Sequence, residues 1–71
     1  MNLIKVESSN IDSIGYNSSQ ELFVKYKGGN IYKYKDVPNK LVEDLMKAES
    51  KGKYMNSIIK NNYKYEKVDK F

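Results

Sequence analysis

The sequence predicts an α+β domain, in which a three-stranded antiparallel β-meander is followed by a helical hairpin packed on one face of the sheet (βββαα). Apolar and polar residues alternate in the first half of the chain, and apolar residues recur at helical spacing in the second half. The 71 residues have room for a single domain, 1–71, with one small core. We assign residues 1–8 and 66–71 to no element and expect them to be flexible.

The first half contains three predicted strands. Residues 11–16 form the first, and turn-forming residues follow it. The second strand, ELFVKYK, and the third, IYKYK, are separated by GGN, which predicts a β-hairpin. Alternation places a set of aliphatic and tyrosine side chains on the face toward the helices: Ile14, Tyr16, Leu22, Val24, Tyr26, Tyr32 and Tyr34.

The hairpin register follows from the loop that lets apolar side chains share a face. A two-residue Gly-Gly loop would set apolar residues opposite lysines, whereas a three-residue Gly-Gly-Asn loop, 28–30, pairs Tyr26 with Tyr32. We therefore predict the longer loop, with a glycine or the asparagine in the left-handed conformation. This register sets Lys25 directly opposite Lys33 on the other face of the hairpin.

The second half contains two predicted helices. Pro38 suits the first turn of a helix, where its missing N–H is no loss, and Ser50 suits the N-cap of the next helix. An apolar stripe follows each of them: Leu41, Val42, Leu45 and Met46 in the first helix, and Tyr54, Met55, Ile58 and Ile59 in the second. Because the gap between the helices is short, we expect an αα-hairpin lying on the sheet.

The residues that the chain lacks exclude several kinds of site. It contains neither cysteine nor histidine, which excludes disulfides, thiolate or imidazole zinc sites, and thiol or imidazole nucleophiles. Glu43 and Asp44 lie on the solvent side of a predicted helix and Asp36 lies in a turn, so no acid–base pair is indicated. We therefore predict no enzyme activity, no catalytic residue, no metal and no cofactor.

The location and assembly follow from similar arguments. The apolar run within the stretch MNLIKVESSN is too short for a signal sequence. Nowhere does the sequence contain about 18 consecutive apolar residues, the length that a membrane-spanning helix needs. We expect a cytoplasmic protein without a membrane partner, as a monomer or weak dimer.

The positive charge is concentrated late in the chain. The net charge is +4, with one lysine against three acids in residues 1–24 and twelve lysines against six acids in residues 25–71. A polyanion would be attracted to the later part. Every basic residue is lysine, which supplies point charges for phosphates rather than the bidentate fork that arginine offers to bases.

The stretch SKGKY is the main candidate for an anion site. Lys51 and Lys53 lie in the first turn of the second predicted helix, where free N–H groups are already positive, and Gly52 would let another group approach the backbone. An anion would compensate this charge. Ser50 would contribute its hydroxyl, with supporting contacts from Tyr54, Asn56 and Lys60. The alternative is that Ser50 only caps the helix and the lysines are solvated.

A secondary basic face is predicted on the hairpin, from Lys25, Lys33 and Lys35. Facing lysines repel each other across a strand pair, which a negatively charged partner would relieve. The alternative is that these lysines only prevent association through the open sheet. Tyr54 and Tyr63 are candidates for stacking on bases, since they lie near the predicted anion site.

The order of these segments resembles the KTSC domain, a small module named after the C-terminus of certain lysyl-tRNA synthetases and also found as a stand-alone bacterial and phage protein. The resemblance covers about residues 6–65, and RNA binding is what attachment to a synthetase implies for the family. Arginine often occurs in the family near the positions of Lys53 or Lys60, whereas this chain has lysine. The residues that carry the resemblance are Ser8, Ser9, Ile14, Gly15, Tyr16, Tyr32, Tyr34, Val37, Pro38, Ser50, Lys51, Gly52, Lys53, Tyr54 and Asn56.

Two functions are therefore compatible with the sequence. The first is a non-catalytic module that binds RNA, with tRNA as one candidate, or another polyanion through the basic helix N-terminus. The alternative is a protein-interaction module, encoded by a phage or mobile element, that docks on a host protein through a strand edge or the tail around Val68 and Phe71.

Overall fold

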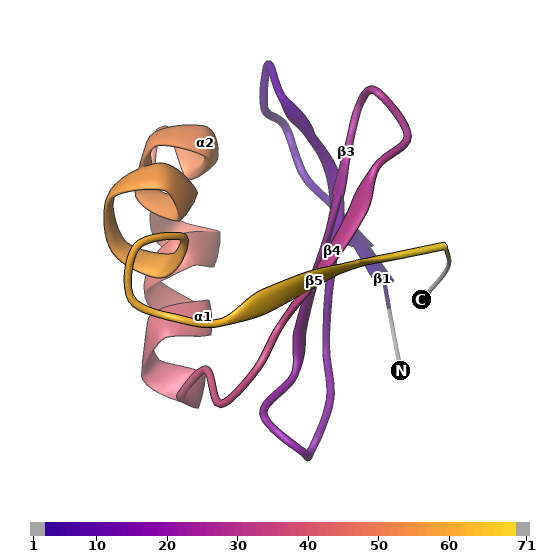
Figure 1. Cartoon of the computed structure of the whole chain (residues 1–71). Coiled ribbons are helices and arrows are strands. Elements are labelled where there is room, and N and C mark those ends of the chain that lie inside the picture. Colours follow the sequence, from indigo (N-terminus) through magenta and orange to yellow (C-terminus); the bar gives the residue numbers. More distant parts are fainter. Residues whose placement is uncertain (1–2, 70–71) are drawn as a thin grey trace.

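The computed structural model describes residues 3–69 and has an α+β fold, with helices covering one side of an antiparallel sheet (Figure 1). The class agrees with the sequence prediction. The elements, in chain order, are β1 (Leu3–Lys5), β2 (Ile11–Tyr16), β3 (Leu22–Tyr26), β4 (Ile31–Tyr34), α1 (Asn39–Lys47), α2 (Lys51–Tyr54), the π-helical turn η1 (Met55–Ile59) and β5 (Tyr65–Val68).

The sheet has five strands in the order β1-β2-β3-β4-β5, so the prediction of three strands was wrong. Ile4 on β1 lies opposite Ile14, and Tyr65 on β5 lies opposite Tyr34. Both added strands are short edge strands whose described side chains are mostly exposed, so they lack the alternating burial that identifies a strand from sequence. The predicted flexible ends thus contain strand residues, while residues 1–2 and 70–71 lie outside the described part, including Phe71 of the predicted contact tail.

The β3–β4 hairpin differs from the predicted register by two residues. Val24, not Tyr26, lies opposite Tyr32, because the loop consists of residues 27–29. The Tyr26 N–H donates to the Asn30 carbonyl (2.8 Å), and Gly29 takes the left-handed conformation with φ of 98°. A shift of two residues keeps every side chain on its predicted face, although it changes its neighbours.

The new register also removes the predicted pair of facing lysines. Lys33 lies opposite Phe23, and Lys25 lies opposite Ile31. The repulsion on which the secondary basic face was predicted is therefore absent from the strand pairing.

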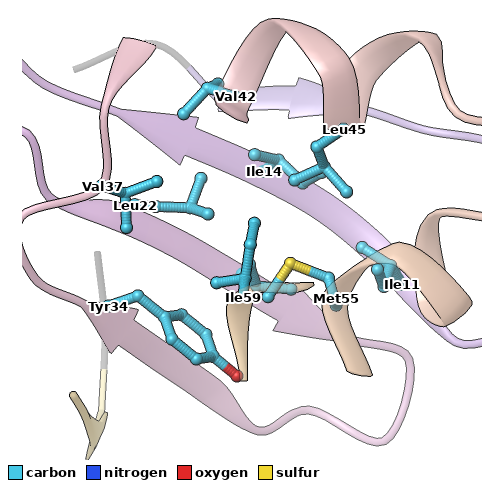
Figure 2. Packing of buried hydrophobic residues seen from close by; sticks show 10 residues of the cluster. Ile11, Ile14, Leu22, Tyr34, Val37, Val42, Leu45, Met55 and Ile59 are labelled. Carbon is cyan, nitrogen blue, oxygen red and sulfur yellow. The ribbon is translucent and has the colours of Figure 1, made fainter. Parts of the chain in front are cut away.

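The core lies between the sheet and the helices (Figure 2). On β2 the pairing shifts between Ile11 and Ser13, and this irregularity lets both Ile11 and Ile14 point toward the helices. The apolar stripes predicted for the helices contribute buried residues from each helical segment: Val42, Leu45, Met55 and Ile59. Together they pack against the buried residues of the sheet in one core cluster.

The helical segment ends in an unusual turn. Ser50 is the N-cap of α2, as predicted, since its Oγ accepts a hydrogen bond from the Lys53 N–H (3.4 Å). After Tyr54 the chain continues as a π-helix, whose last bond runs from the Lys60 N–H to the Met55 carbonyl (2.7 Å). Turns of this kind are frequent at functional sites. No helix within residues 3–69 is long and apolar enough to cross a membrane.

Candidate nucleic-acid interface

The start of α2 is engaged in contacts within the chain. The Lys51 ammonium donates a hydrogen bond to the Ala48 carbonyl (3.2 Å) at the end of α1. Carbonyls at a helix C-terminus carry partial negative charge, so this lysine is already placed beside a favourable partner.

Gly52 also has a neighbour within the chain. A Cβ added to Gly52 would lie 3.4 Å from Nδ2 of Asn10, so the bare backbone lets the segment before β2 pack closely against α2. Lys53, in contrast, is exposed and forms no ion pair within residues 3–69. Of the two lysines predicted at this helix start, Lys53 is therefore the one whose ammonium group is available to a partner.

A pocket of about 290 Å³ opens between the sheet and η1, and we call it the tyrosine pocket. Its lining comes from three neighbouring strands, the β3–β4 loop and the helical segment. The residues are Tyr26, Asn30, Tyr32, Tyr34, Asn56, Lys60 and Tyr65. Asn56 and Lys60 were predicted site residues, and the structure brings these two together.

The tyrosine rings form a continuous row across the strands. Tyr26 and Tyr32 meet edge to face with centroids 5.7 Å apart, and Tyr32 and Tyr65 do the same at 5.6 Å. Tyr34 and Tyr65 are tilted at 5.3 Å. Tyr34 is 1% exposed, and its burial raises the pKa of its hydroxyl, as does its hydrogen bond with Tyr26. Tyr65 is 47% exposed and forms an open wall of the pocket.

The helical side of the pocket is polar. Asn56 and Lys60 are four residues apart in the π-helical turn and its end, and both side chains are exposed. Tyr54 does not line the pocket. It is half-buried and packs against the core, and this burial raises the pKa of its hydroxyl. Tyr63 packs against the core in the same way.

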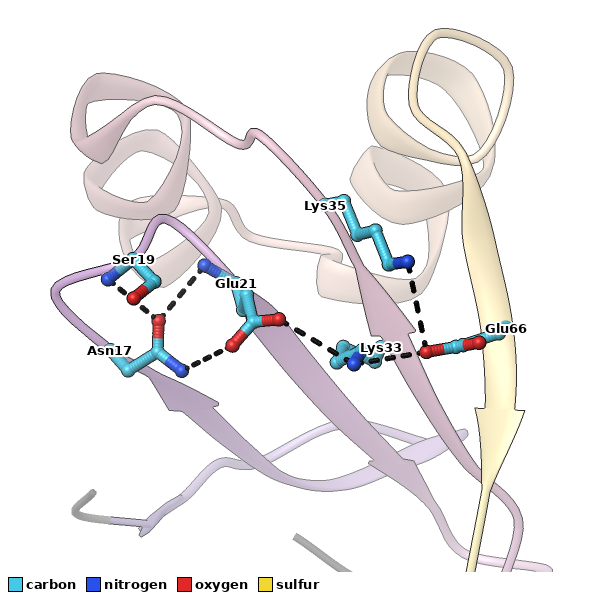
Figure 3. A network of polar contacts seen from close by, with 6 residues as sticks. All are labelled: Asn17, Ser19, Glu21, Lys33, Lys35 and Glu66. Carbon is cyan, nitrogen blue, oxygen red and sulfur yellow. Dashed lines mark hydrogen bonds and ion pairs between the residues drawn. The ribbon is translucent and has the colours of Figure 1, made fainter.

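The face of the sheet away from the helices carries a network of ion pairs (Figure 3). The Lys33 ammonium lies 2.9 Å from a carboxylate oxygen of Glu66 and 3.5 Å from one of Glu21. Lys35 lies 4.0 Å from Glu66, and Asn17 donates to Glu21 (2.9 Å). The Lys33 hydrogen bond holds the pKa of Glu66 below its usual range, and the same bond raises the pKa of Lys33.

Two of the lysines predicted as a secondary basic face are thus partly neutralised. Lys33 bridges acids on both sides of β4, and Lys35 shares Glu66 with it. Lys25 has no acidic partner within residues 3–69 and is half-buried. The network joins β5 to the rest of the sheet, so it supports the strand that carries Tyr65.

Sequence reasoning did not assign five lining residues of the pocket to the site. Tyr26, Tyr32 and Tyr34 were interpreted as core, which holds for Tyr34, whereas Tyr26 and Tyr32 are only half-buried. Tyr65 was considered only as a possible sheet or groove contact of a tail without an assigned element, and it lies in β5. The available signal was the density of tyrosine, a residue that commonly lies where one side of its ring is packed and its hydroxyl reaches water. Asn30 was considered only as a loop residue.

The family model of the KTSC domain matches residues 7–63. A crystal structure of a KTSC domain protein from Yersinia pestis superposes with a TM-score of 0.87 at 32% identity, covering 94% of this chain and 96% of that one. A protein of Stutzerimonas stutzeri, itself described only as uncharacterised, is 32% identical over 97% of this chain and 100% of its own length.

A larger relative contains a similar region. A lysine–tRNA ligase of Nostoc punctiforme is 37% identical over 67 residues, which cover 93% of this chain and 12% of the ligase.

Proposed function

Since the chain belongs to the KTSC domain family, we propose that it is a non-catalytic module that binds RNA or another polyanion beside the tyrosine pocket. A region similar to this chain occurs in an enzyme named for its action on a tRNA, and a module attached there is well placed to contact RNA. The same relationship favours a cytoplasmic location.

Among residues 3–69, no group of three or more acids is positioned to hold a metal.

The observation that carries the proposal is the distribution of free lysines. Lys53 and Lys60 lie on the helical segment, are exposed, and have no acidic partner within residues 3–69. Lys67 on β5 lies opposite Tyr32 on β4, and therefore on the same side of the sheet as the pocket. Lys60 lines the pocket beside the aromatic rings, and lysines combined with aromatic rings are what single-stranded nucleic acid binds.

The interface extends from the helix start toward the pocket. Lys53 precedes Asn56 by three residues, a spacing that places both on one side of the helical segment. The predicted anion site at Ser50, Lys51 and Gly52 adjoins this line. We centre the proposed interface on Lys53, Asn56 and Lys60, because Lys51 and Gly52 contact Ala48 and Asn10.

The proposal is tested by measuring tRNA affinity against salt concentration. Lysine contacts to phosphate release counterions, so affinity should fall steeply with salt. We expect the double substitution Lys53→Ala with Lys60→Ala to weaken binding to all RNA sequences and to lower the salt slope by about 2, one for each phosphate contact.

The matched control removes the same charge elsewhere. Lys5 lies on the opposite edge strand and Lys47 at the end of α1, and both side chains are exposed. The double substitution Lys5→Ala with Lys47→Ala should leave the slope nearly unchanged. If both double variants bind alike, the interface is misplaced. If the unmodified protein binds no RNA but retains one protein from a lysate, the protein-interaction alternative is favoured, with the exposed strand β5 as its contact edge.

A further inference from the structure

The tyrosine pocket has the size and lining of a site for one small, flat ligand. Ligand pockets commonly range from about 300 to 1,000 Å³, and this one, at about 290 Å³, lies just below that range. Its walls are aromatic, so the ligand they favour is planar. Tyr65 leaves nearly half its surface in water, and a stacked ring would cover it.

The polar side chains at the pocket indicate which hydrogen-bonding groups a planar ligand would need on its edge. Asn30 and Asn56 approach the pocket from the hairpin loop and from η1, and both are exposed. Within residues 3–69, neither side-chain amide takes part in a hydrogen bond. Each amide offers both donors and an acceptor, which matches the mixed edge of a nucleobase.

A charged group stands beside these amides. Lys60 lines the pocket, and Lys53 and Lys67, which do not line it, carry further positive charge. A free base would not use these charges, whereas a base linked to phosphates on both sides would use them all. The distribution therefore fits a segment of a strand better than an isolated heterocycle.

We propose that the tyrosine pocket receives a single unstacked nucleobase from single-stranded RNA, with the base stacked on Tyr65, its edge at Asn30 and Asn56, and a neighbouring phosphate at Lys60. This inference rests on the proposed function, because it names the ligand of the same surface. It requires that the base be free of pairing, since bases inside an RNA duplex are stacked and cannot enter a pocket.

The test compares four ligands by fluorescence competition: a single-stranded RNA of mixed sequence, the same RNA annealed to its complement, inorganic polyphosphate, and a mixture of nucleoside monophosphates. We expect the single strand to bind most tightly and the monophosphates to bind at least 100-fold more weakly. Equal affinity for the duplex would overturn the inference. Equal affinity for the monophosphates would overturn the assignment of a strand.

Two substitutions at one position separate the ring from its hydroxyl. Tyr65→Phe retains the stacking surface and should bind single-stranded RNA within about two-fold of the unmodified protein, while Tyr65→Leu should lose about ten-fold or more. Polyphosphate should bind equally to all three proteins. Since Tyr65 is exposed, both variants are expected to fold, which their amide NMR spectra would show. Upfield shifts of base protons on binding to the unmodified protein give a second measurement that needs no variant.

The outcomes distinguish this inference from the proposed function. If Tyr65→Leu binds single-stranded RNA as tightly as Tyr65→Phe, and no base proton shifts upfield, the base pocket is refuted while lysine-mediated RNA binding stands. If the unmodified protein binds neither RNA nor polyphosphate, both proposals fail.

Discussion

The two faces of the sheet both carry lysines, but their charges have different surroundings. On the face away from the helices, Lys33 contacts Glu21 and Glu66, and Lys35 also contacts Glu66. On the helix side, Lys60 at the pocket and Lys67 on β5 have no acidic partner within residues 3–69. A count of lysines along the chain treats these positions alike. The contacts show that one group holds strands together and the other leaves its charge available.

The same contrast occurs inside the tyrosine pocket. Tyr34 is almost completely buried and lies in the core cluster, whereas Tyr65 on the neighbouring strand is half in water. Both rings line the same pocket. Tyr34 therefore contributes mainly to stability, whereas Tyr65 has exposed surface that a ligand could contact.

The largest expected effect separates these two tyrosines. Tyr34→Ala should cost about 3–5 kcal/mol, as for other large aromatic residues removed from a core. That is comparable to the whole stability that a single small core provides, so the variant should be largely unfolded at 25 °C. Tyr65→Ala should cost only about 1 kcal/mol, because much of its ring is already exposed. Urea denaturation followed by circular dichroism measures both. Similar losses for the two variants would show that Tyr34 and Tyr65 do not differ in their contribution to the core.

Some of this fold could be predicted from sequence because its causes are local. The apolar stripes at Val42, Leu45, Met55 and Ile59 identified the helical face that becomes buried, and Ser50 identified the start of α2. Each of these signals needs only a few neighbouring residues.

The features that were missed depend on distant parts of the chain. Strand β5 is stabilised by pairing with β4 and by the ion pair between Glu66 and Lys33, two residues far apart in sequence. The hairpin register depends on which residue takes the left-handed position, and Gly28 and Gly29 are equally suited to it. In the structure only Gly29 does so.

The candidate site was predicted unevenly for the same reason. Asn56 and Lys60 follow from the helical pattern and the family resemblance. Tyr65 joins them only because β5 returns beside β4, and periodicity in the sequence contains no signal for that pairing.

A smaller effect compares the start of α2 with the pocket. Gly52 is helical, and alanine is favoured over glycine in helices by up to about 1 kcal/mol. The added Cβ would lie 3.4 Å from Nδ2 and 4.0 Å from Cβ of the exposed Asn10 side chain, distances of ordinary van der Waals contact. Gly52→Ala should therefore raise the free energy of unfolding by up to about 1 kcal/mol and leave RNA affinity unchanged. Thermal denaturation and a binding titration measure the two quantities. A loss of RNA affinity with retained stability would move the anion contact from the pocket rim to the helix start.

The smallest expected effect concerns the ion pairs on the outer face. Lys33→Gln removes the cation between Glu21 and Glu66, while Lys25→Gln removes the same charge from a neighbouring strand where no acid is paired with it. At pH 7 we expect a lower Tm for Lys33→Gln and no comparable loss for Lys25→Gln. Exposed pairs contribute little, so the loss of stability should be smaller than the loss expected for Tyr65→Ala. RNA affinity should change little in either variant.

The pH dependence shows whether the ion pairs cause the difference. Folding lowers the pKa of Glu21 and Glu66, so their contribution is present above the ordinary glutamate range, near 4.5, and is lost as pH falls through the lowered values. The folded pKa of Lys33 is raised, so its contribution persists through neutral pH and disappears only as pH rises past that value. The Tm difference between Lys33→Gln and the unmodified protein should therefore shrink on acidification from pH 7 to pH 3. A difference that stays constant over this range would assign the effect to the packing of the lysine side chain, and the electrostatic contrast between the two faces would then lose its support.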